Sequence, residues 1–247
     1  MHVNLNKTMK ITKNYKAIFI DMDETLCDTR KADLLAAKEF SNHLLEHFKI
    51  NKAELLSDQF LKAIYKTPEA LKSLKSSKIE EKDYRSDVFK WVCKQNDIAI
   101  ELPYLKLSEH MMSLRMKYFD FFDGAWDLLQ KLRKDYQTVL ITNGVLYSQQ
   151  PKLNACNMQA SIDHIILAGE TPYEKPQREI FNLACRKASV APDQAIHIGD
   201  RLDADIQGAI NSGIDSIWIN PDQLEGSLHL NPTYTVKRFI DIENIFY

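Results

Sequence analysis

The sequence predicts an α/β fold, in which a core built on a parallel sheet is interrupted by a helical insertion after the first strand. From residue 124 onward, short apolar runs alternate with amphipathic segments of helical length, which is the pattern of βαβ units. All seven glycines lie between Gly124 and Gly226, so the preceding segment differs in composition. We therefore expect a core formed by residues 1–29 and 120–247, and an all-helical cap formed by residues 30–119.

The core is expected to contain five strands with helices between them. Each strand is a short apolar run bounded by polar or turn residues. The runs are "IFI" (18–20), "TVLIT" (138–142), "HIILA" (164–168), "AIHIG" (195–199) and "SIWIN" (216–220). The intervening helices are expected at residues 126–136, 147–157, 178–190 and 203–213. Pro151 lies within the second of these, where proline fits only a first turn or a kink.

The insertion is expected to be helical because its apolar residues recur at spacings of three and four. This periodicity is present in residues 32–48, 83–95 and 103–122. A lysine-rich segment at residues 72–83 is expected to be a solvated connection between helices. Residues 1–14 are expected to form a polar lead-in to the first strand.

Composition excludes several classes of function. The chain has 247 residues, of which 45% are apolar and 27% charged, which suffices for a full core. A net charge of -2 does not fit a nucleic-acid-binding surface, and the apolar runs are too short to cross a membrane. The N-terminal segment lacks the apolar centre of a secretory signal. We expect a cytoplasmic monomer or homodimer with no membrane and no nucleic-acid partner.

The four cysteines are scattered along the chain without a C-x-x-C pair, which argues against a zinc site or a disulfide framework. We expect reduced thiols that are mostly buried. Cys27 lies close in sequence to two aspartates, and a packing role is favoured for it over a chemical one.

Polar side chains follow the expected strands at the points where the strands end. Because the carboxyl ends of parallel strands lie at one edge of the sheet, ligands of such folds bind there. The residues brought to this edge are Asp21, Asp23, Thr142, Asn143, Lys175 and Asp200.

Several carboxylates at one edge require a compensating cation, since like charges in a partly buried site repel each other. Oxygen ligands of this kind suit Mg²⁺, which commonly binds one or two carboxylates together with substrate phosphate. Lys175 adds a second positive charge, so the site suits a dianionic group such as phosphate. The Thr142 hydroxyl and the backbone N–H groups of Asn143 and Gly144 can donate to phosphate oxygens. Alternatively, Thr142 bonds only its own turn.

In such a site Asp21 can attack phosphorus and form an aspartyl-phosphate. Asp23 can then donate a proton to the leaving oxygen and later accept one from the attacking water. These different roles require Asp21 to be ionised and Asp23 to be protonated at the first step. We expect metal contact to lower the pKa of Asp21, and an apolar niche to raise the pKa of Asp23.

Four segments resemble the four motifs of the haloacid dehalogenase superfamily, in the order in which that family carries them. They are "DMDETLCDT", "ITNG", "YEKPQREIF" and "IGDRLDADIQGA", and they span the chain from about residue 16 to residue 220. The resemblance implies a Rossmann-like core, and it implies that the helical insertion is a type-one cap that closes over the site.

The resemblance also implies roles for the matching residues. Asp21 matches the nucleophile, which is also a Mg²⁺ ligand, and Asp23 matches the acid/base, whose backbone carbonyl also binds Mg²⁺. Thr142 and Lys175 match the phosphate-binding residues, and Asp200 matches the third metal ligand.

Two positions refine these implications. Asp205 matches the second acid of the fourth motif, which contacts the metal directly, acts through water, or orients Lys175. Asp23 is absent from the dehalogenases of the family, so its presence favours phosphoryl transfer to water. The stretches "GDRLDADIQGAINSG" and "ITNG" resemble most the branch of nucleotide monophosphatases and N-acylneuraminate-9-phosphatases.

The predicted function is a Mg²⁺-dependent phosphomonoester hydrolase acting on a small phosphorylated metabolite, either a nucleoside monophosphate or a sugar or sugar-acid phosphate. Two alternatives remain open at this stage. A phosphosugar mutase would keep the aspartyl-phosphate but return the phosphoryl group to its substrate, and a catalytically silent member would only bind its ligand. His197 lies within an apolar strand and is expected to be a core residue.

Overall fold

The computed structural model describes residues 13–72, 80–224 and 230–247. These residues divide into two compact units. One unit combines the residues up to Asp28 with those from Asp120 onward, and the other consists of Thr29–Phe119. The assignment of these units to catalytic and cap roles remains a prediction. The expected lead-in at 1–14 and the connection at 72–83 fall largely outside the described residues.

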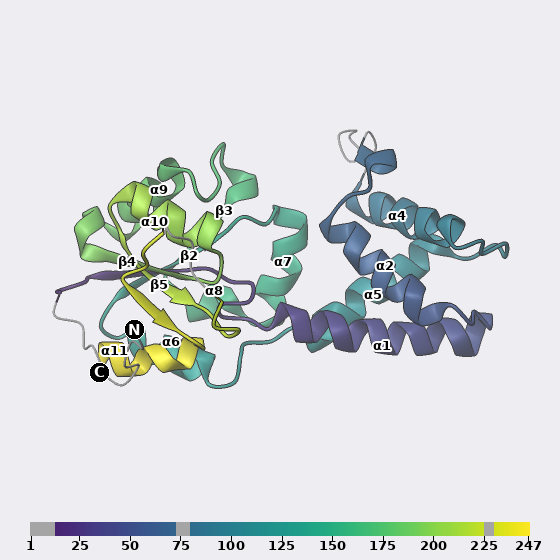
Figure 1. Ribbon diagram of the computed structural model, residues 1–247, viewed down its shortest axis with the longest axis horizontal. Coiled ribbons are helices and arrows are strands. Elements are labelled where there is room, and N and C mark those ends of the chain that lie inside the picture. The colour runs from purple at the N-terminus through teal and green to yellow at the C-terminus, as the bar shows by residue number, and fades with distance from the viewer. Residues whose placement is uncertain (1–12, 73–79, 225–229) are drawn as a thin grey trace. The chain divides into compact units, whose positions relative to one another are not determined.

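The first unit is built on a six-stranded sheet in the order β3-β2-β1-β4-β5-β6, and every neighbouring pair is parallel (Figure 1). This confirms the predicted fold class. The strands are β1 (Ala17–Ile20), β2 (Gln137–Thr142), β3 (His164–Leu167), β4 (Ala195–Gly199), β5 (Asp215–Ile219) and β6 (Tyr234–Val236). Of these, β6 was not predicted, because it is a short edge strand whose residues are half-buried or exposed.

Helices pack on both faces of this sheet, with α9 and α10 on one face and α6 and α11 on the other (Figure 1). The α-helices are α6 (Ala125–Leu132), α7 (Leu146–Ala155), α8 (Met158–Ser161), α9 (Arg178–Ala188), α10 (Gln207–Ser212) and α11 (Glu243–Phe246). Shorter turns are the 3-10 helices Ala168–Glu170, Pro192–Gln194 and Phe239–Ile242, and a π-helical segment at Leu202–Ile206. Pro151 lies inside α7, beyond its first turn.

Apolar side chains between the sheet and the helices form the core of the first unit. Phe19 of β1, Ile141 of β2 and Phe181 of α9 belong to one buried cluster and are inaccessible to solvent. Because successive residues of a strand face opposite sides, Ile18 and Ile20 fill the other face of β1. The strand that precedes Asp21 is therefore fixed on both sides.

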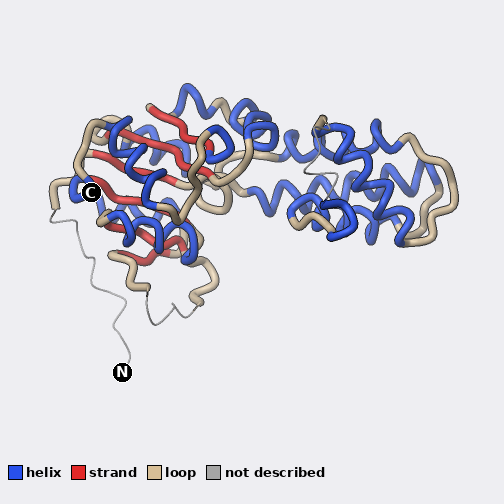
Figure 2. Tube along the Cα trace, turned by 90° about the horizontal axis from the view of Figure 1, so that it is seen from above, coloured by secondary structure: helices blue, strands red, loops and turns tan. Residues whose placement is uncertain are grey.

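The second unit consists of helices joined by loops and turns (Figure 2). They are α1 (Thr29–Phe48), α2 (Ala53–Tyr65), the 3-10 turn Glu69–Leu71, α4 (Glu81–Gln95) and α5 (Tyr104–Tyr118). Phe40, Phe60 and Phe89 come from three different helices and meet at its centre. The ring of Phe89 lies 5.5 Å from that of Phe40 and 4.9 Å from that of Phe60. This unit therefore has an apolar core of its own.

Two smaller findings bear on the expectations from sequence. Within the described ranges, no helix has the length and apolar character needed to traverse a bilayer. All four cysteines are free thiols, and Cys27 is completely buried, in keeping with a packing role.

Candidate active site

The register of the three central strands determines the position of the site. Ile20, the last residue of β1, is level with Leu140 of β2 and with Ile198 of β4, so these strands end close together at one edge of the sheet. The backbone N–H of Asp21 extends this register by donating to the carbonyl of Ile198 at 2.9 Å. Residues that follow these strands therefore emerge at one edge of the sheet.

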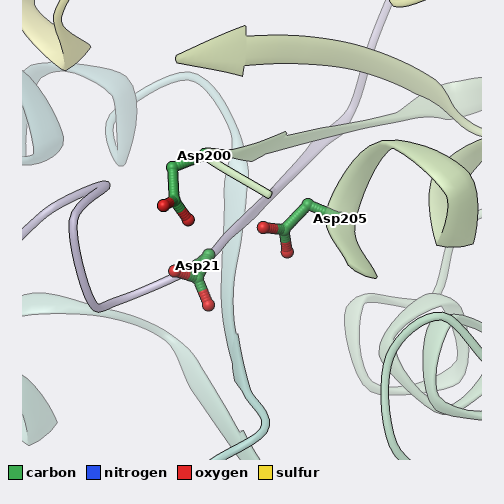
Figure 3. A group of neighbouring side chains, drawn as sticks. All are labelled: Asp21, Asp200 and Asp205. Atoms are coloured by element: carbon green, nitrogen blue, oxygen red, sulfur yellow. The ribbon is translucent and has the colours of Figure 1, made fainter. Parts of the chain in front are cut away.

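Three aspartates cluster at this edge. Asp21 follows β1, Asp200 follows β4, and Asp205 lies in the π-helical segment before α10. One carboxylate oxygen from each lies within 4.8 Å of the others (Figure 3). Asp21 and Asp205 are buried, and Asp200 is half-buried. The structure thus brings together two of the three expected metal ligands, Asp21 and Asp200, and Asp205, the acid whose role was left open.

The environment of this cluster disfavours negative charge on two of its members. Burial raises the pKa of Asp21 to about 8, even though the nearby Lys175 opposes that shift. Burial and the charge of Asp205 raise the pKa of Asp200 to about 7. A divalent cation would reverse both effects, since an opposite charge favours the ionised form of a carboxylate. The donor set consists of hard oxygens, which fits Mg²⁺.

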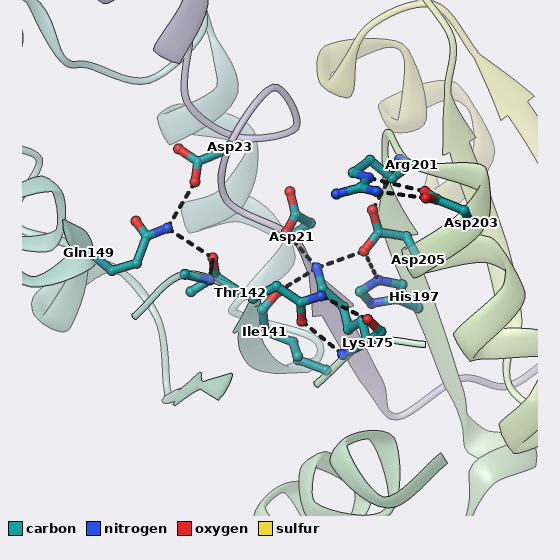
Figure 4. Close-up of polar contacts among 12 residues, drawn as sticks. Asp21, Asp23, Ile141, Thr142, Gln149, Lys175, His197, Arg201, Asp203 and Asp205 are labelled. Atoms are coloured by element: carbon teal, nitrogen blue, oxygen red, sulfur yellow. Dashed lines mark hydrogen bonds and ion pairs between the residues drawn. The ribbon is translucent and has the colours of Figure 1, made fainter. Parts of the chain in front are cut away.

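Lys175 lies between two of the aspartates and is almost completely buried. Its Nζ donates to Asp21 Oδ1 at 2.5 Å, to Asp205 Oδ1 at 2.7 Å and to the Ile141 carbonyl at 2.8 Å (Figure 4). Burial favours a neutral amine, but the two carboxylates outweigh it and raise the pKa of Lys175. The site therefore holds a fixed positive charge next to Asp21.

Asp205 is held by three donors, which distinguishes it from the other two acids. Besides Lys175, it accepts from His197 Nε2 at 2.9 Å and from the backbone N–H of Arg201 at 3.1 Å. Although burial opposes ionisation, Lys175 and His197 shift the pKa of Asp205 well below its usual range. These contacts favour an orienting role for Asp205 toward Lys175.

His197 is fully buried, as expected for a core residue, but it also takes part in the polar network. Burial lowers the pKa of His197. Since a carboxylate only accepts, the neutral ring carries its proton on Nε2 and donates it to Asp205. Apart from a histidine in a strand that leads to a site residue, no feature of the sequence indicated this contact.

The loop after β2 differs in part from expectation. The Asn143 side chain donates from Nδ2 to the Lys175 carbonyl at 2.7 Å, and its Oδ1 accepts from the Lys175 N–H at 2.8 Å. This side chain therefore binds the lysine loop, and only its backbone N–H remains for phosphate. The buried Thr142 hydroxyl accepts from the Gly144 N–H at 3.3 Å, so the alternative turn contact is present.

The apolar niche predicted for Asp23 is wrong. Its Oδ2 accepts from Gln149 Nε2 at 3.0 Å (Figure 4), and its Oδ1 accepts from Lys152 Nζ at 2.6 Å; both donors belong to α7. Asp23 is not a member of the carboxylate cluster formed by the other three aspartates. Lys152 and Gln149 were missed because a helical position far along the chain gives no indication of which strand end it faces.

Comparison with known proteins gives consistent results. A model of haloacid dehalogenase-like hydrolases matches residues 15–213. The human N-acylneuraminate-9-phosphatase is 30% identical over 213 residues, which cover 83% of this chain and 82% of that protein. The pyrimidine 5'-nucleotidase PynA of Streptococcus pneumoniae is 27% identical over 233 residues, covering 92% of this chain and 93% of that protein.

The HAD-hydrolase YfnB of Bacillus subtilis is similar in both sequence and structure. It is 26% identical over 241 residues, which cover 94% of this chain and 96% of that protein. Its crystal structure, which contains magnesium, superposes with a TM-score of 0.68 at 23% identity and covers 94% of this chain and 99% of that chain. This structural similarity supports the fold.

Proposed function

The chain belongs to the haloacid dehalogenase-like hydrolase family, and on this premise we propose that it is a phosphatase acting through an aspartyl-phosphate on Asp21. One observation carries the proposal. A buried lysine and three clustered carboxylates lie at the edge of the sheet where ligands of such folds bind. This arrangement suits a divalent cation and a phosphate dianion together.

The proposed metal is Mg²⁺, held by the carboxylates of Asp21 and Asp200 and by the backbone carbonyl of Asp23. The fit depends on the hard carboxylate oxygens of Asp21 and Asp200, which lie within 4.8 Å of each other, and on raised pKa values of both groups that a cation would relieve. When bound, the ion supplies positive charge that orients the phosphate and keeps the carboxylates ionised. Asp205 is proposed to orient Lys175 instead of binding the ion.

The chain's own residues would then carry two displacements at phosphorus. In the first, a carboxylate oxygen of Asp21 bonds to phosphorus while the bond to the leaving oxygen breaks, and Asp23, which has to take up a proton before this step, gives that proton to the leaving oxygen. In the second, Asp23 takes a proton from water, whose oxygen attacks phosphorus and releases phosphate from Asp21. Lys175, the Thr142 hydroxyl and the backbone N–H of Asn143 hold the phosphoryl oxygens in both steps.

The proposed substrate is a small phosphorylated metabolite, either a nucleoside monophosphate or a sugar or sugar-acid phosphate. The named relatives support this class, since they include an N-acylneuraminate-9-phosphatase and a pyrimidine 5'-nucleotidase. The proposed role of the helical unit Thr29–Phe119 is that of a cap, which selects among such substrates.

A panel of phosphorylated metabolites tests this proposal. Each compound is incubated with the protein in Mg²⁺ and again in EDTA, and free phosphate is measured. We expect Mg²⁺-dependent release from a subset of nucleoside and sugar phosphates. Isomerised hexose phosphate without free phosphate would instead identify a mutase, and no turnover of any compound would identify a silent binding protein.

A further inference from the structure

Helix α7 directs two polar side chains at Asp23. Gln149 and Lys152 are three positions apart, so they lie on the same face of the helix. Both residues are at least 95% buried. Lys152 Nζ lies 2.6 Å from Asp23 Oδ1, and Gln149 Nε2 lies 3.0 Å from Asp23 Oδ2. Each oxygen of the Asp23 carboxylate is therefore bound by a donor from one helix.

Gln149 also connects Asp23 to the proposed phosphate site. Its Nε2 lies 3.3 Å from Thr142 Oγ1. Its side chain covers Gly144 so closely that a Cβ at that position would lie 1.9 Å from Nε2. Within the described part of the chain, the side-chain amide oxygen of Gln149, Oε1, has no hydrogen-bond partner. The polar contacts of this side chain are thus directed to Asp23 and Thr142.

A buried lysine is costly, and its position therefore calls for an explanation. Burying an ammonium group is unfavourable unless it is paired and hydrogen-bonded. The Lys152 side chain is 6% exposed while its partner Asp23 is 29% exposed, so the amine is placed behind a carboxylate that still reaches solvent. The Lys152 ammonium is thus shielded from solvent while the Asp23 carboxylate keeps access to it, as a group that exchanges protons with substrate and water requires.

We propose that Lys152, together with Gln149, is a positioning residue that holds the Asp23 carboxylate in place for proton transfer to the leaving group. This inference rests on the proposed phosphatase function. Neither residue touches the reacting atoms in this role. Both act through the geometry of Asp23, since proton transfer requires hydrogen-bond reach to the leaving oxygen.

This role predicts a dependence on the leaving group. An alkyl alkoxide needs a proton as it departs, whereas p-nitrophenolate is stable enough to leave without one. The parameter kcat/KM covers the steps up to aspartyl-phosphate formation, so it reports leaving-group departure. A displaced Asp23 should therefore lower kcat/KM for alkyl phosphates much more than for p-nitrophenyl phosphate.

The test compares Lys152→Met with Lys152→Arg on p-nitrophenyl phosphate and on an alkyl phosphate that the wild type hydrolyses. We expect Lys152→Met to lower kcat/KM for the alkyl phosphate by about 10- to 100-fold, and for p-nitrophenyl phosphate by only about 3-fold. Lys152→Arg should keep most of the wild-type kcat/KM for the alkyl phosphate, because it keeps a positively charged hydrogen-bond donor beside Asp23. Lys131→Met removes an exposed lysine paired with Glu243 and serves as the matched control, with no change expected in either value.

A double-mutant cycle with Asp23→Asn separates positioning from a general structural effect. If Lys152 acts through Asp23, Lys152→Met should cause no further loss of alkyl phosphatase activity in the Asp23→Asn background. Gln149→Leu provides a second variant and should show a smaller loss of the same selectivity. It keeps the test decisive even if Lys152→Met fails to fold.

The contrary outcomes are distinct. An equal loss on both substrates, or an undiminished further loss in the Asp23→Asn background, would overturn the positioning role while leaving the phosphatase function in place. A wild-type protein that releases phosphate from neither substrate would overturn the proposed function and this inference with it.

Discussion

Each unit of this protein contains a buried ion-pair cluster, and the two clusters differ in their balance of charge. In the helical unit, Arg115 Nε donates to Asp33 Oδ1 at 2.6 Å, and the Tyr65 hydroxyl donates to Asp33 Oδ2 at 2.5 Å. One guanidinium there faces one carboxylate. In the other unit, Lys175 pairs with Asp21 and Asp205, and Asp200 completes a cluster of three carboxylates.

The difference separates a structural cluster from a binding site. A balanced buried pair neutralises itself and joins the helices that supply it. A cluster with surplus carboxylates is left with uncompensated charge, which is costly in a buried site unless a cation binds or the groups take up protons. The raised pKa values of Asp21 and Asp200 show this cost. Four experiments test the contrast, from the largest expected effect to the smallest.

Asp21→Asn should have the largest effect on activity and no destabilising effect on the fold. It removes the proposed nucleophile, so phosphate release should fall by roughly 10⁴-fold or more. Thermal unfolding in metal-free buffer above pH 8 should not occur at a lower temperature, because Asp21 is ionised there and the substitution removes one surplus buried charge. Near wild-type hydrolysis of p-nitrophenyl phosphate by this variant would exclude Asp21 as the nucleophile.

Arg115→Leu should instead lower the stability of the fold, because it disrupts a structural ion pair. It leaves the half-buried Asp33 without its cation, which should cost about 3 kcal/mol in the free energy of unfolding, the lower end of the cost for a fully buried pair. Urea denaturation followed by circular dichroism measures this loss. The double variant Asp33→Leu/Arg115→Leu should recover most of it, since it removes both charges. A double variant no more stable than Arg115→Leu would show that the pair does more than neutralise itself.

Stabilisation by Mg²⁺ should increase with pH. The folded-state pKa values of Asp21 and Asp200, about 8 and about 7, lie above the unfolded value of about 4. The metal-free folded state therefore binds more protons in this range, and its stability from these groups falls as pH rises from about 4 to 8. Mg²⁺ binds the ionised carboxylates, and at a hundredfold excess over Kd it contributes about 2.7 kcal/mol.

We accordingly expect differential scanning calorimetry to show a clear rise in Tm with Mg²⁺ at pH 8 and a small one at pH 5. Asp200→Asn is the control and should reduce the rise at pH 8. An equal shift at both pH values would mean that the ion binds elsewhere.

Asp203→Asn should have the smallest effect. Asp203 pairs with Arg201 only two positions from Asp205, but both side chains of this pair are mostly exposed. Losing such a pair changes the free energy of unfolding by less than about 1 kcal/mol. Denaturant titration and the phosphate assay should both remain close to wild type. A large loss of activity would assign Asp203 to the site despite its exposure.

The parts of this molecule that could be predicted from sequence are those encoded locally. Apolar runs predicted five of the strands, and the rule that parallel strands end at one edge brought Asp21, Asp200 and Lys175 together. The surroundings of Asp23 could not be predicted, because Lys152 is 129 positions away and only tertiary packing determines which strand end α7 faces. The contact of the Asn143 side chain with the main chain at Lys175 could not be predicted for the same reason, because Lys175 is 32 positions away.

The double hydrogen bond between the Asn143 side chain and the main chain at Lys175 has a further consequence. It joins the loop after β2 to the loop that contains Lys175, so neither loop can be lengthened, exchanged or redesigned without the other. Efforts to transfer these two loops, which contain the proposed phosphate-binding residues, into another scaffold should move both together.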